Sequence, residues 1–400
     1  MKVEKLTLRN FRNIEQSSLH PHAHLNFLVG INGQGKTSFI EALSFLSTLR
    51  SFRGAKNDEV IRWDTEWSEI SCILSEGDWK TEIKVTFSKQ GNRSSKVAFI
   101  NGKAYKSSTQ FLSQRFGSFE LGFHTVVFNP SDHDLVRGEP SIRRSYMDRV
   151  ISAEDLDYLT TLTKYQRLVD QRNALLKNEV RVSKELLAGF SEPLVSYGAQ
   201  ITYKRLQWIQ RLKEHLNPVA HQIAPRQPDL AAFYTSNWVP NFTDLSICNN
   251  KLGTSDLAGQ SSQPSLEILE QSFWKQLSVL GDAELRSRST LVGPHRDDWV
   301  LYLGPQVLKG HGSQGEVRSA LLALKLSEIE LFRKRTGHRP LLLLDDFSSE
   351  LDRERRSFLL RYLSETDLQV FVTSTEEPPF EGKRFWVSGG TLTESTASLP

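Results

Sequence analysis

The sequence predicts an α/β fold in which a mainly parallel sheet carries a phosphate-binding loop, next to an antiparallel β part and an inserted, mainly helical lobe. Three observations predict it. A glycine-rich loop follows an early strand, strand-like segments occur at both ends of the chain, and the apolar period becomes helical over residues 154–288. We therefore expect an N-terminal part of the main lobe over 1–135, the inserted lobe over 136–288, and the C-terminal part of the main lobe over 289–400.

Apolar residues alternate with polar ones in the N-terminal part, which is typical of half-buried strands. This pattern occurs at Leu6 and Leu8, over Ile83 to Phe87, and at Val97 and Phe99, and Asn101-Gly102 predicts a tight hairpin turn. Continuous apolar runs predict further strands at Leu25–Val29, Val126–Phe128, Trp299–Leu303, Leu341–Leu344 and Leu368–Val372.

The inserted lobe has helical periodicity. Leu162, Val169 and Leu176 are spaced by seven residues, and two more helices are predicted over Leu194–Leu216 and Leu266–Leu280. The sequence therefore predicts three helices as the main part of this lobe.

The composition is that of an ordinary globular protein. Of 400 residues, 38% are hydrophobic and 24% are charged, which argues against disorder and against a membrane bundle. The chain shows neither an apolar run of membrane-spanning length nor a signal peptide at its start, so we expect a cytoplasmic protein with no membrane partner. The net charge is only +3, so any nucleic-acid interaction must depend on local basic patches.

The string GINGQGKTS, Gly30–Ser38, has the spacing of a phosphate-binding loop. A strand precedes it and an apolar-periodic helix follows, so backbone N–H groups at the helix start can bind phosphate oxygens. We expect the loop to bind a nucleoside triphosphate, with Lys36 reaching the β- and γ-phosphates and Thr37 holding Mg²⁺. The predicted nucleotide-binding residues here are Gly30, Asn32, Gly33, Gly35, Lys36, Thr37 and Ser38. The alternative is a glycine-rich turn with an incidental lysine.

An acidic pair follows the leucine run of LLLLDDFSSELD, Leu341–Asp352. Carboxylates at the end of a buried strand lie where parallel sheets bind ligands. We expect Asp345 to be a water-mediated Mg²⁺ ligand and Asp346, with Lys36, to be catalytic, since a carboxylate there can orient the attacking water. The alternative is two solvated aspartates that cap the next helix. Lys36 and Asp345 are 309 residues apart, so the middle of the chain is best placed as an insertion into one sheet.

Five motifs, in order along the chain, resemble those of the RecF family, the bacterial recombination-mediator ATPases of the ABC and SMC class. They are FRN at 11–13, the phosphate loop, FNPSDHDLVRGEPSIRRSYMD at 128–148, GPHRDD at 293–298 and DDFSSELD at 345–352. The resemblance implies an ABC-type ATPase head with an inserted helical arm lobe, and ATP and Mg²⁺ as cofactors.

The resemblance also implies a signature motif, HGSQGEVRS, at 311–319. Ser313, Gly315 and Glu316 would bind ATP held by a second copy of the chain, in a head-to-tail homodimer that forms with ATP. Ser349–Asp352 would cross that dimer interface. Without the resemblance, Ser313 could equally be a simple helix N-cap.

Two positions depart from the ABC pattern. VTST, Val372–Thr375, stands where these ATPases carry a histidine, so Ser374 or a neighbouring threonine would contact the γ-phosphate weakly or not at all. Asn129 is the candidate substitute for their Q-loop glutamine. Asp346 is also one methylene shorter than the usual glutamate. We therefore expect a weak DNA-dependent ATPase, in which hydrolysis acts as a switch.

Basic residues with interleaved aromatics form local patches that could neutralise DNA phosphates. They comprise Lys204, Arg205, Arg211 and Lys213 with Tyr203 and Trp208; Lys164, Arg167, Arg172 and Lys177; and Arg143 with Arg144. The alternative for each patch is a solvated helix face with ion pairs along it. The resemblance implies binding of duplex DNA near single-strand gaps and RecA loading with RecO and RecR. Rival functions are an SMC-like head ATPase of an antiviral nuclease system, a transporter ATPase subunit, and an interaction protein with a degenerate site.

Overall fold

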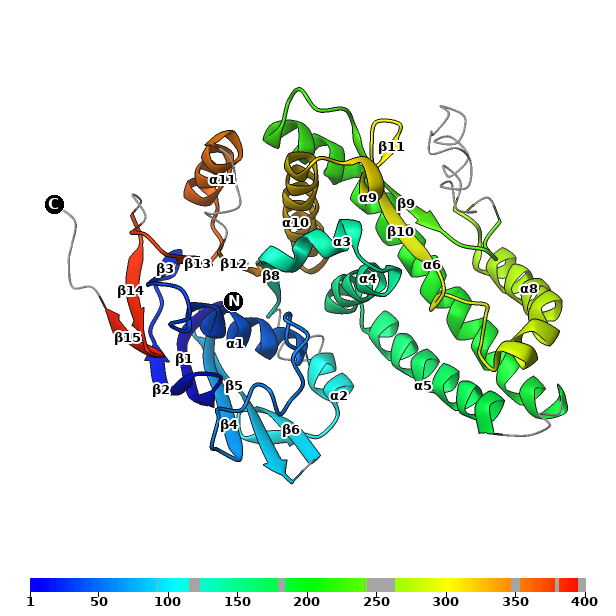
Figure 1. Cartoon of the computed structure of the whole chain (residues 1–400), viewed down its shortest axis with the longest axis horizontal. Helices are drawn as coiled ribbons and strands as arrows, with labels where there is room; N and C mark the ends of the chain where they lie inside the picture. The colour runs from blue at the N-terminus through cyan, green and yellow to red at the C-terminus, as the bar shows by residue number, and fades with distance from the viewer. Residues whose placement is uncertain are drawn as a thin grey trace. The chain divides into compact units, whose positions relative to one another are not determined.

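The computed structural model describes residues 1–91, 93–114, 123–178, 184–240, 242, 263–346, 353–377 and 381–394 (Figure 1). The chain folds into two compact units. Unit 1 comprises Met1–Asp132 with Phe332–Pro400, and unit 2 comprises His133–Leu331. Unit 2 extends past the expected boundary at 288 because the strand that follows pairs with a strand of the insertion.

One sheet of unit 1 is mostly parallel, with the strand order β15-β14-β3-β13-β12-β8. Only β15 runs antiparallel to its neighbour, β14. The strands are β3 (Leu25–Val29), β8 (Thr125–Phe128), β12 (Leu341–Leu344), β13 (Val370–Ser374), β14 (Lys383–Ser388) and β15 (Thr391–Glu394). The predicted strands at Leu25–Val29 and Leu341–Leu344 are confirmed, and the leucines of β12 are all buried, as in the interior of a parallel sheet.

The second sheet of unit 1 is antiparallel, with the order β2-β1-β4-β5-β6-β7. Its strands are β1 (Lys2–Phe11), β2 (Ile14–Leu19), β4 (Trp67–Glu76), β5 (Trp79–Gln90), β6 (Arg93–Ile100) and β7 (Lys103–Tyr105). Between β6 and β7, Asn101 and Gly102 have φ of 48° and 80°, the positive values that a type I′ turn requires. The predicted antiparallel part and its hairpin turn are therefore confirmed.

Helix α1 (Lys36–Thr48) packs between these two sheets. It contacts β1 and β5 of one sheet and β8, β12 and β13 of the other, and its Phe39, Ile40 and Leu43 are completely buried. One hydrophobic core joins α1 with both sheets, so the start of α1 has a fixed position. Helices α2 (Ser108–Ser113) and α11 (Arg353–Glu365) also belong to unit 1.

Unit 2 is mainly helical. Its helices are α3 (Asp134–Arg137), α4 (Pro140–Glu154), α5 (Leu156–Asn178), α6 (Lys184–Ile223), α8 (Leu266–Ser287), α9 (Leu308–His311) and α10 (Gln314–Thr336), which continues into unit 1. Helices α5 and α8 both pack against α6 (Figure 1), so the three predicted helices are confirmed. A small sheet, β11-β10-β9, completes the unit, with β9 (Leu230–Thr235), β10 (Asp298–Leu303) and β11 (Gln306–Val307).

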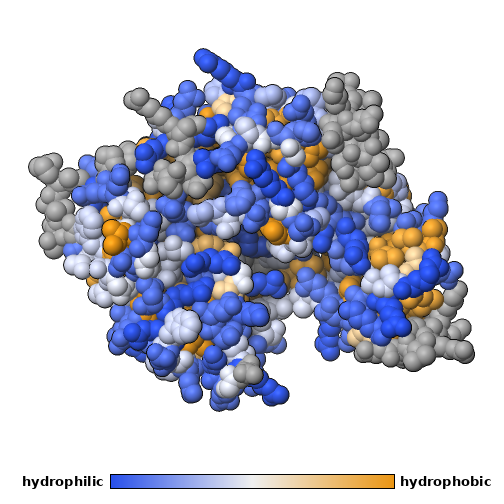
Figure 2. Space-filling model, in the orientation of Figure 1, coloured by the Kyte–Doolittle hydropathy of each residue, from blue (hydrophilic) through white to orange (hydrophobic). Residues whose placement is uncertain are grey.

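The visible face of the molecule is mostly hydrophilic, with a patch of hydrophobic residues over α8 (Figure 2). The exposed apolar side chains of this helix are Leu266, Ile268, Trp274 and Val279. Within the described ranges, no helix is both long and apolar enough to span a lipid bilayer.

Candidate functional site

Four strands of the parallel sheet end at one edge, and the predicted phosphate and metal residues follow them. Strands β3, β13, β12 and β8 are neighbours in that order and run parallel. The phosphate loop follows β3, and Asp345 and Asp346 follow β12. Thr373 lies near the end of β13, the strand between β3 and β12. The fold therefore brings together residues from both ends of the chain, at the edge where parallel sheets bind ligands.

The phosphate loop has a conformation that only glycine adopts without strain. Gly33 and Gly35 have φ of 81° and 106°, in the left-handed region. A Cβ on Gly35 would lie 2.9 Å from the side chain of Asn13, and one on Gly30 would lie 2.4 Å from the carbonyl oxygen of Val387. Among the described residues other than its chain neighbours, none has an atom within 4 Å of a Cβ placed on Gly33. Asn13 and Val387 therefore brace the loop at Gly35 and Gly30 and leave Gly33 without such a contact in this part of the chain.

Lys36 holds its ammonium group against this loop. Its Nζ donates to the carbonyl oxygens of Gly30 and Ile31, at 2.5 and 3.0 Å. Burial lowers the pKa of Lys36, and the nearby negative charges of Asp346 and Asp345 oppose this effect. The positive charge of Lys36 therefore lies near both the phosphate loop and the acidic pair, where it can stabilise the negative charge of a bound phosphate.

Thr37 and Asp345 are in direct contact. The Thr37 hydroxyl donates to Oδ1 of Asp345 at 2.9 Å, and the hydroxyl of Thr373 donates to the same oxygen at 3.0 Å. Burial raises the pKa of Asp345, and these two hydrogen bonds oppose the rise. A carboxylate beside a hydroxyl is the kind of oxygen ligand set that Mg²⁺ binds together with nucleotide phosphates. The residues present therefore fit the expected metal.

Asp346 has a strained backbone. Its φ is 49°, which is uncommon for a residue with a Cβ although aspartate tolerates it better than most. Its N–H donates to the hydroxyl of Thr373 at 2.7 Å, which holds this conformation. The proposed role of Asp346 in orienting water stays a prediction.

A brace behind the loop was not predicted from the sequence. The Ser38 hydroxyl donates to Oδ1 of Asn13 at 3.2 Å, and Arg12 donates to both carboxylate oxygens of Glu41, at 2.9 and 2.6 Å. Glu41 lies in α1 and is completely buried. In the sequence, the FRN string at 11–13 is one motif of the family resemblance, and by itself it does not indicate this brace.

A second brace comes from the hairpin between β14 and β15. The N–H of Gly389 donates to Oε1 of Gln34 at 2.6 Å, and the N–H of Gly390 donates to the carbonyl oxygen of Gln34 at 2.9 Å. No motif in the sequence indicated this contact, because it joins segments that are more than 350 residues apart.

The two departures from the ABC pattern use their side chains within their own turns. The Ser374 hydroxyl donates to the carbonyl oxygen of Glu376 at 2.6 Å and accepts from its N–H at 3.2 Å. Asn129 donates from Nδ2 to Asp132 at 3.1 Å and accepts at Oδ1 from the N–H of Ser131 at 2.9 Å. A phosphate contact by either residue would have to replace these bonds.

The predicted signature motif lies in unit 2, at the start of α10. The N–H of Ser313 donates to the Glu316 carboxylate at 2.7 Å, and the N–H of Glu316 donates to the Ser313 hydroxyl at 3.3 Å. This reciprocal pair is a capping box, so the helix-cap interpretation is confirmed as local structure. Binding of ATP by Ser313, Gly315 and Glu316 stays a prediction. The predicted interface segment Ser349–Asp352 lies outside the described residues.

The prediction of a DNA surface is wrong for the central residues of the largest basic patch, because their side chains are internal. The guanidinium of Arg205 is buried and donates to Asp148 at 2.8 Å and to the carbonyl oxygen of Pro294 at 2.6 Å. Trp208 is completely buried, and Arg211 forms an ion pair with Glu154. Neither interpretation therefore holds for Arg205 and Trp208, because both are buried and do not belong to a solvated face.

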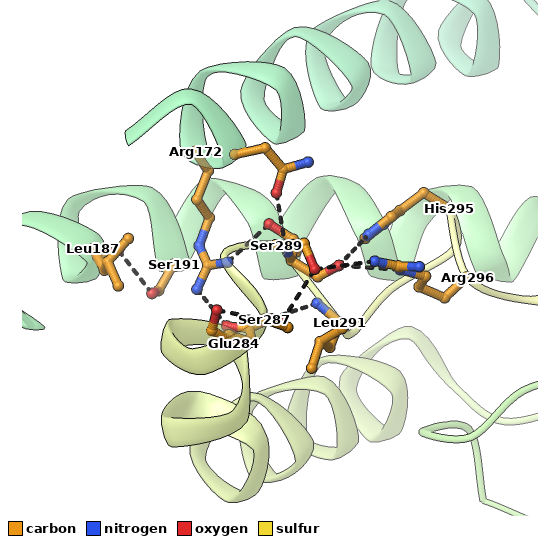
Figure 3. A network of polar contacts seen from close by, with 11 residues as sticks. Arg172, Leu187, Ser191, Glu284, Ser287, Ser289, Leu291, His295 and Arg296 are labelled. Carbon is orange, nitrogen blue, oxygen red and sulfur yellow. Dashed lines mark hydrogen bonds and ion pairs between the residues drawn. The ribbon is translucent and has the colours of Figure 1, made fainter. Parts of the chain in front are cut away.

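Arg172 and Arg143 are internal as well. Figure 3 shows Arg172 of α5 reaching the end of α8, where it donates to Glu284 at 2.6 Å and to Thr290 at 2.8 Å. Arg143 donates to both carboxylate oxygens of Asp298, at 2.8 and 2.6 Å. Of the basic residues predicted along α5, those with exposed side chains are Lys164, Arg167 and Lys177.

Comparison with known proteins agrees with this architecture. The family model described as RecF/RecN/SMC N terminal domain matches residues 2–388. A protein of Geotalea daltonii named DNA replication and repair protein RecF is 33% identical over 94% of this chain and 93% of its own length. One of Geobacter metallireducens with the same name is 34% identical over 98% of this chain and its whole length.

Solved structures give the same result. A structure described as the recombination mediator protein RecF with ATP, in the RecFOR pathway, has a TM-score of 0.81 and 30% identity, and covers 98% of this chain and 99% of its own. An SMC head domain of Pyrococcus furiosus, 12% identical with a TM-score of 0.52, shares the fold. With the bonded pair of Thr37 and Asp345 at the sheet edge, these matches lead to one conclusion: the chain belongs to the RecF family, within the RecF/RecN/SMC group of ABC-type ATPases.

Proposed function

We propose that this chain is an ATP-dependent DNA-binding protein of recombinational gap repair and replication-fork maintenance, acting in the cytoplasm. The observation that supports the proposal is a connected set of hydrogen bonds. It joins Thr37 to Asp345, Asp345 to Thr373, and Thr373 to Asp346, near the ammonium group of Lys36. Relatives that match nearly the whole chain in sequence are named for DNA replication and repair, which supports the choice of nucleic acid as the second ligand.

In this proposal the sheet edge binds ATP with Mg²⁺ and hydrolyses it slowly. Lys36 and the N–H groups at the start of α1 bind the phosphates, since the first turn of a helix has unpaired donors and a positive dipole. Thr37 and Asp345 hold Mg²⁺, which supplies charge to stabilise the transferring phosphoryl group. Asp346 orients the attacking water. The side chains of Ser374 and Asn129 form hydrogen bonds within their own turns, which is consistent with a weak ATPase that acts as a switch.

ATP favours a closed homodimer in this account. The first turn of α10 from the partner copy, with its Ser313, Gly315 and Glu316, completes the phosphate contacts, and hydrolysis removes them. The closed dimer binds duplex DNA beside a single-strand gap and helps to load RecA together with RecO and RecR. The exposed cations Lys164 and Arg167 of α5 supply sequence-independent phosphate contacts.

Sedimentation velocity with and without ATP tests this proposal. The Asp346→Asn protein binds ATP but hydrolyses it slowly, so it should sediment as a long-lived dimer with ATP and as a monomer without it. The Lys36→Ala protein should remain a monomer in both conditions. A monomeric Asp346→Asn protein at saturating ATP would overturn the switch mechanism.

A further inference from the structure

We infer that Thr373 is a positioning residue for the proposed ATP hydrolysis, because its single hydroxyl orients both members of the acidic pair. The inference deepens the proposed function and rests on it. Thr373 lies in β13, between the strand that leads into the phosphate loop and the strand that ends at Asp345. Its side chain is 1% exposed, so water cannot replace its hydroxyl without a change of structure.

The hydroxyl uses its donor and its acceptor in opposite directions. An ionised carboxylate only accepts and a backbone N–H only donates, so the chemistry of the partners fixes both roles. Thr373 donates to Oδ1 of Asp345 at 3.0 Å and accepts from the N–H of Asp346 at 2.7 Å. One side chain on a third strand therefore links the expected metal ligand to the expected water-orienting group.

Each bond has a separate consequence. At Asp345, the bond from Thr373 is a second anchor for the oxygen that Thr37 also contacts, so the oxygen stays in place if the Thr37 hydroxyl turns toward a metal. At Asp346, the bond fixes a left-handed residue at φ 49°, and this backbone conformation decides where the carboxylate points. Removal of a group that orients a metal ligand in this way typically costs about 10- to 100-fold in metal affinity or activity.

The test compares four proteins: the unmodified chain, Thr373→Val, Thr373→Ser and Thr125→Val. Valine has the shape of threonine without the hydroxyl, and serine keeps the hydroxyl. Thr125→Val makes the same change at a buried threonine of β8, whose hydroxyl contacts Ser47 at the other end of the sheet from the acidic pair. Thr373→Ala serves in place of Thr373→Val if that protein does not fold, as judged by its melting temperature.

Two readouts are measured on all four proteins: steady-state ATP hydrolysis, and the Mg²⁺ concentration that gives half of the nucleotide-dependent rise in melting temperature. We expect Thr373→Val to lower kcat about tenfold or more with KM changed less than about threefold, since misplaced catalytic groups affect the chemical step. We expect its half-maximal Mg²⁺ concentration to rise about tenfold. Thr373→Ser and Thr125→Val should stay within about threefold of the unmodified protein.

Failure of this inference differs from failure of the proposed function. If the unmodified protein shows no Mg²⁺-dependent nucleotide binding, the proposed function is wrong whatever Thr373 does. If it binds nucleotide but Thr373→Val matches Thr373→Ser in both readouts, Thr373 is not a positioning residue. A rise in KM with unchanged kcat would also overturn the inference, because it would indicate a role in binding alone.

Discussion

The hydroxyl of Thr37 donates to the carboxylate of Asp345 at 2.9 Å although the two residues are 308 positions apart in the chain. Thr37 lies in the first turn of α1, and Asp345 directly follows β12. The parallel pairing of β12 with both β8 and β13 aligns the strand ends, so unit 2 can be inserted without separating the halves of the site. Every nucleotide-dependent property expected of the protein depends on this contact region.

Replacement of Lys36 by alanine should weaken nucleotide binding strongly. The variant loses the cation that the structure places against the phosphate loop, and removal of one charge-assisted contact to phosphate weakens binding by at least about tenfold. Fluorescence titration with a labelled ATP analogue and Mg²⁺ measures the effect. Lys103→Ala, an exposed lysine in β7, is the control and should bind normally. Equal affinities for the two variants would contradict the assignment of the loop.

Replacement of Ser313 by aspartate separates a capping role from a phosphate-binding role. Aspartate is as good an N-cap as serine, so α10 should remain stable, but its charge would repel the γ-phosphate of a partner's ATP. We expect Ser313→Asp to melt within about 2 °C of the unmodified protein and to lose ATP-driven dimerisation. Ser313→Thr should keep both properties. If Ser313→Asp dimerises normally with ATP, then Ser313 is a helix cap and nothing more.

The buried ion pair behind the phosphate loop should contribute strongly to stability. Arg12→Ala leaves Glu41, which is completely buried, without its two-bond partner, at a cost of about 3 kcal/mol. Arg62→Ala is the matched control, because Arg62 pairs with the exposed Glu15 and should cost less than about 1 kcal/mol. Urea unfolding measures both values. Equal losses would show that the pair with Glu41 does not brace α1.

The buried Asp297 and the partly buried His295 of unit 2 should give the stability of the protein opposite dependences on pH. Burial raises the pKa of Asp297 from 3.8 to about 6, so the folded state binds the extra proton and the contribution to stability falls as pH rises from about 4 to 6. Burial lowers the pKa of His295 from 6.5 to about 4, so its contribution rises with pH between about 4 and 6.5. Each effect amounts to about 3 kcal/mol, and in the unmodified protein they nearly cancel.

Single variants should reveal the two effects. Relative to the unmodified protein, Asp297→Asn should gain stability as pH rises from about 4 to 6, and His295→Gln should lose stability over the same range. Glutamine can still accept from the Tyr165 hydroxyl and donate to the carbonyl oxygen of Thr290, as His295 does. Urea midpoints at several pH values measure both trends. Trends of the same sign in the two variants would contradict these pKa directions.

The sequence was sufficient to predict features that depend on local chemistry. The glycines, Lys36 and Thr37 form a loop whose spacing is dictated by phosphate geometry, and the leucine run before Asp345 indicates a buried strand. Thr373 could not be assigned its role, because that role depends on which strands become neighbours in the sheet.

The incorrect predictions of DNA-contacting residues concern charged side chains that are buried in the folded chain. Arg205 and Arg172 looked like DNA contacts because each lies among other cations in the sequence. Their partners Asp148 and Glu284 are distant in the chain and become neighbours only after the helices pack. Residue type and helical spacing alone therefore could not separate an exposed basic face from a buried ion pair.

Binding of the Asp346→Asn protein to gapped duplex DNA, followed by fluorescence anisotropy with ATP, with ADP and without nucleotide at two salt concentrations, tests the central claim most directly. The account predicts tight binding only with ATP, weakened at the higher salt concentration because phosphate contacts release counterions. Binding that is independent of nucleotide, or absent in all three conditions, would contradict a nucleotide-gated DNA clamp.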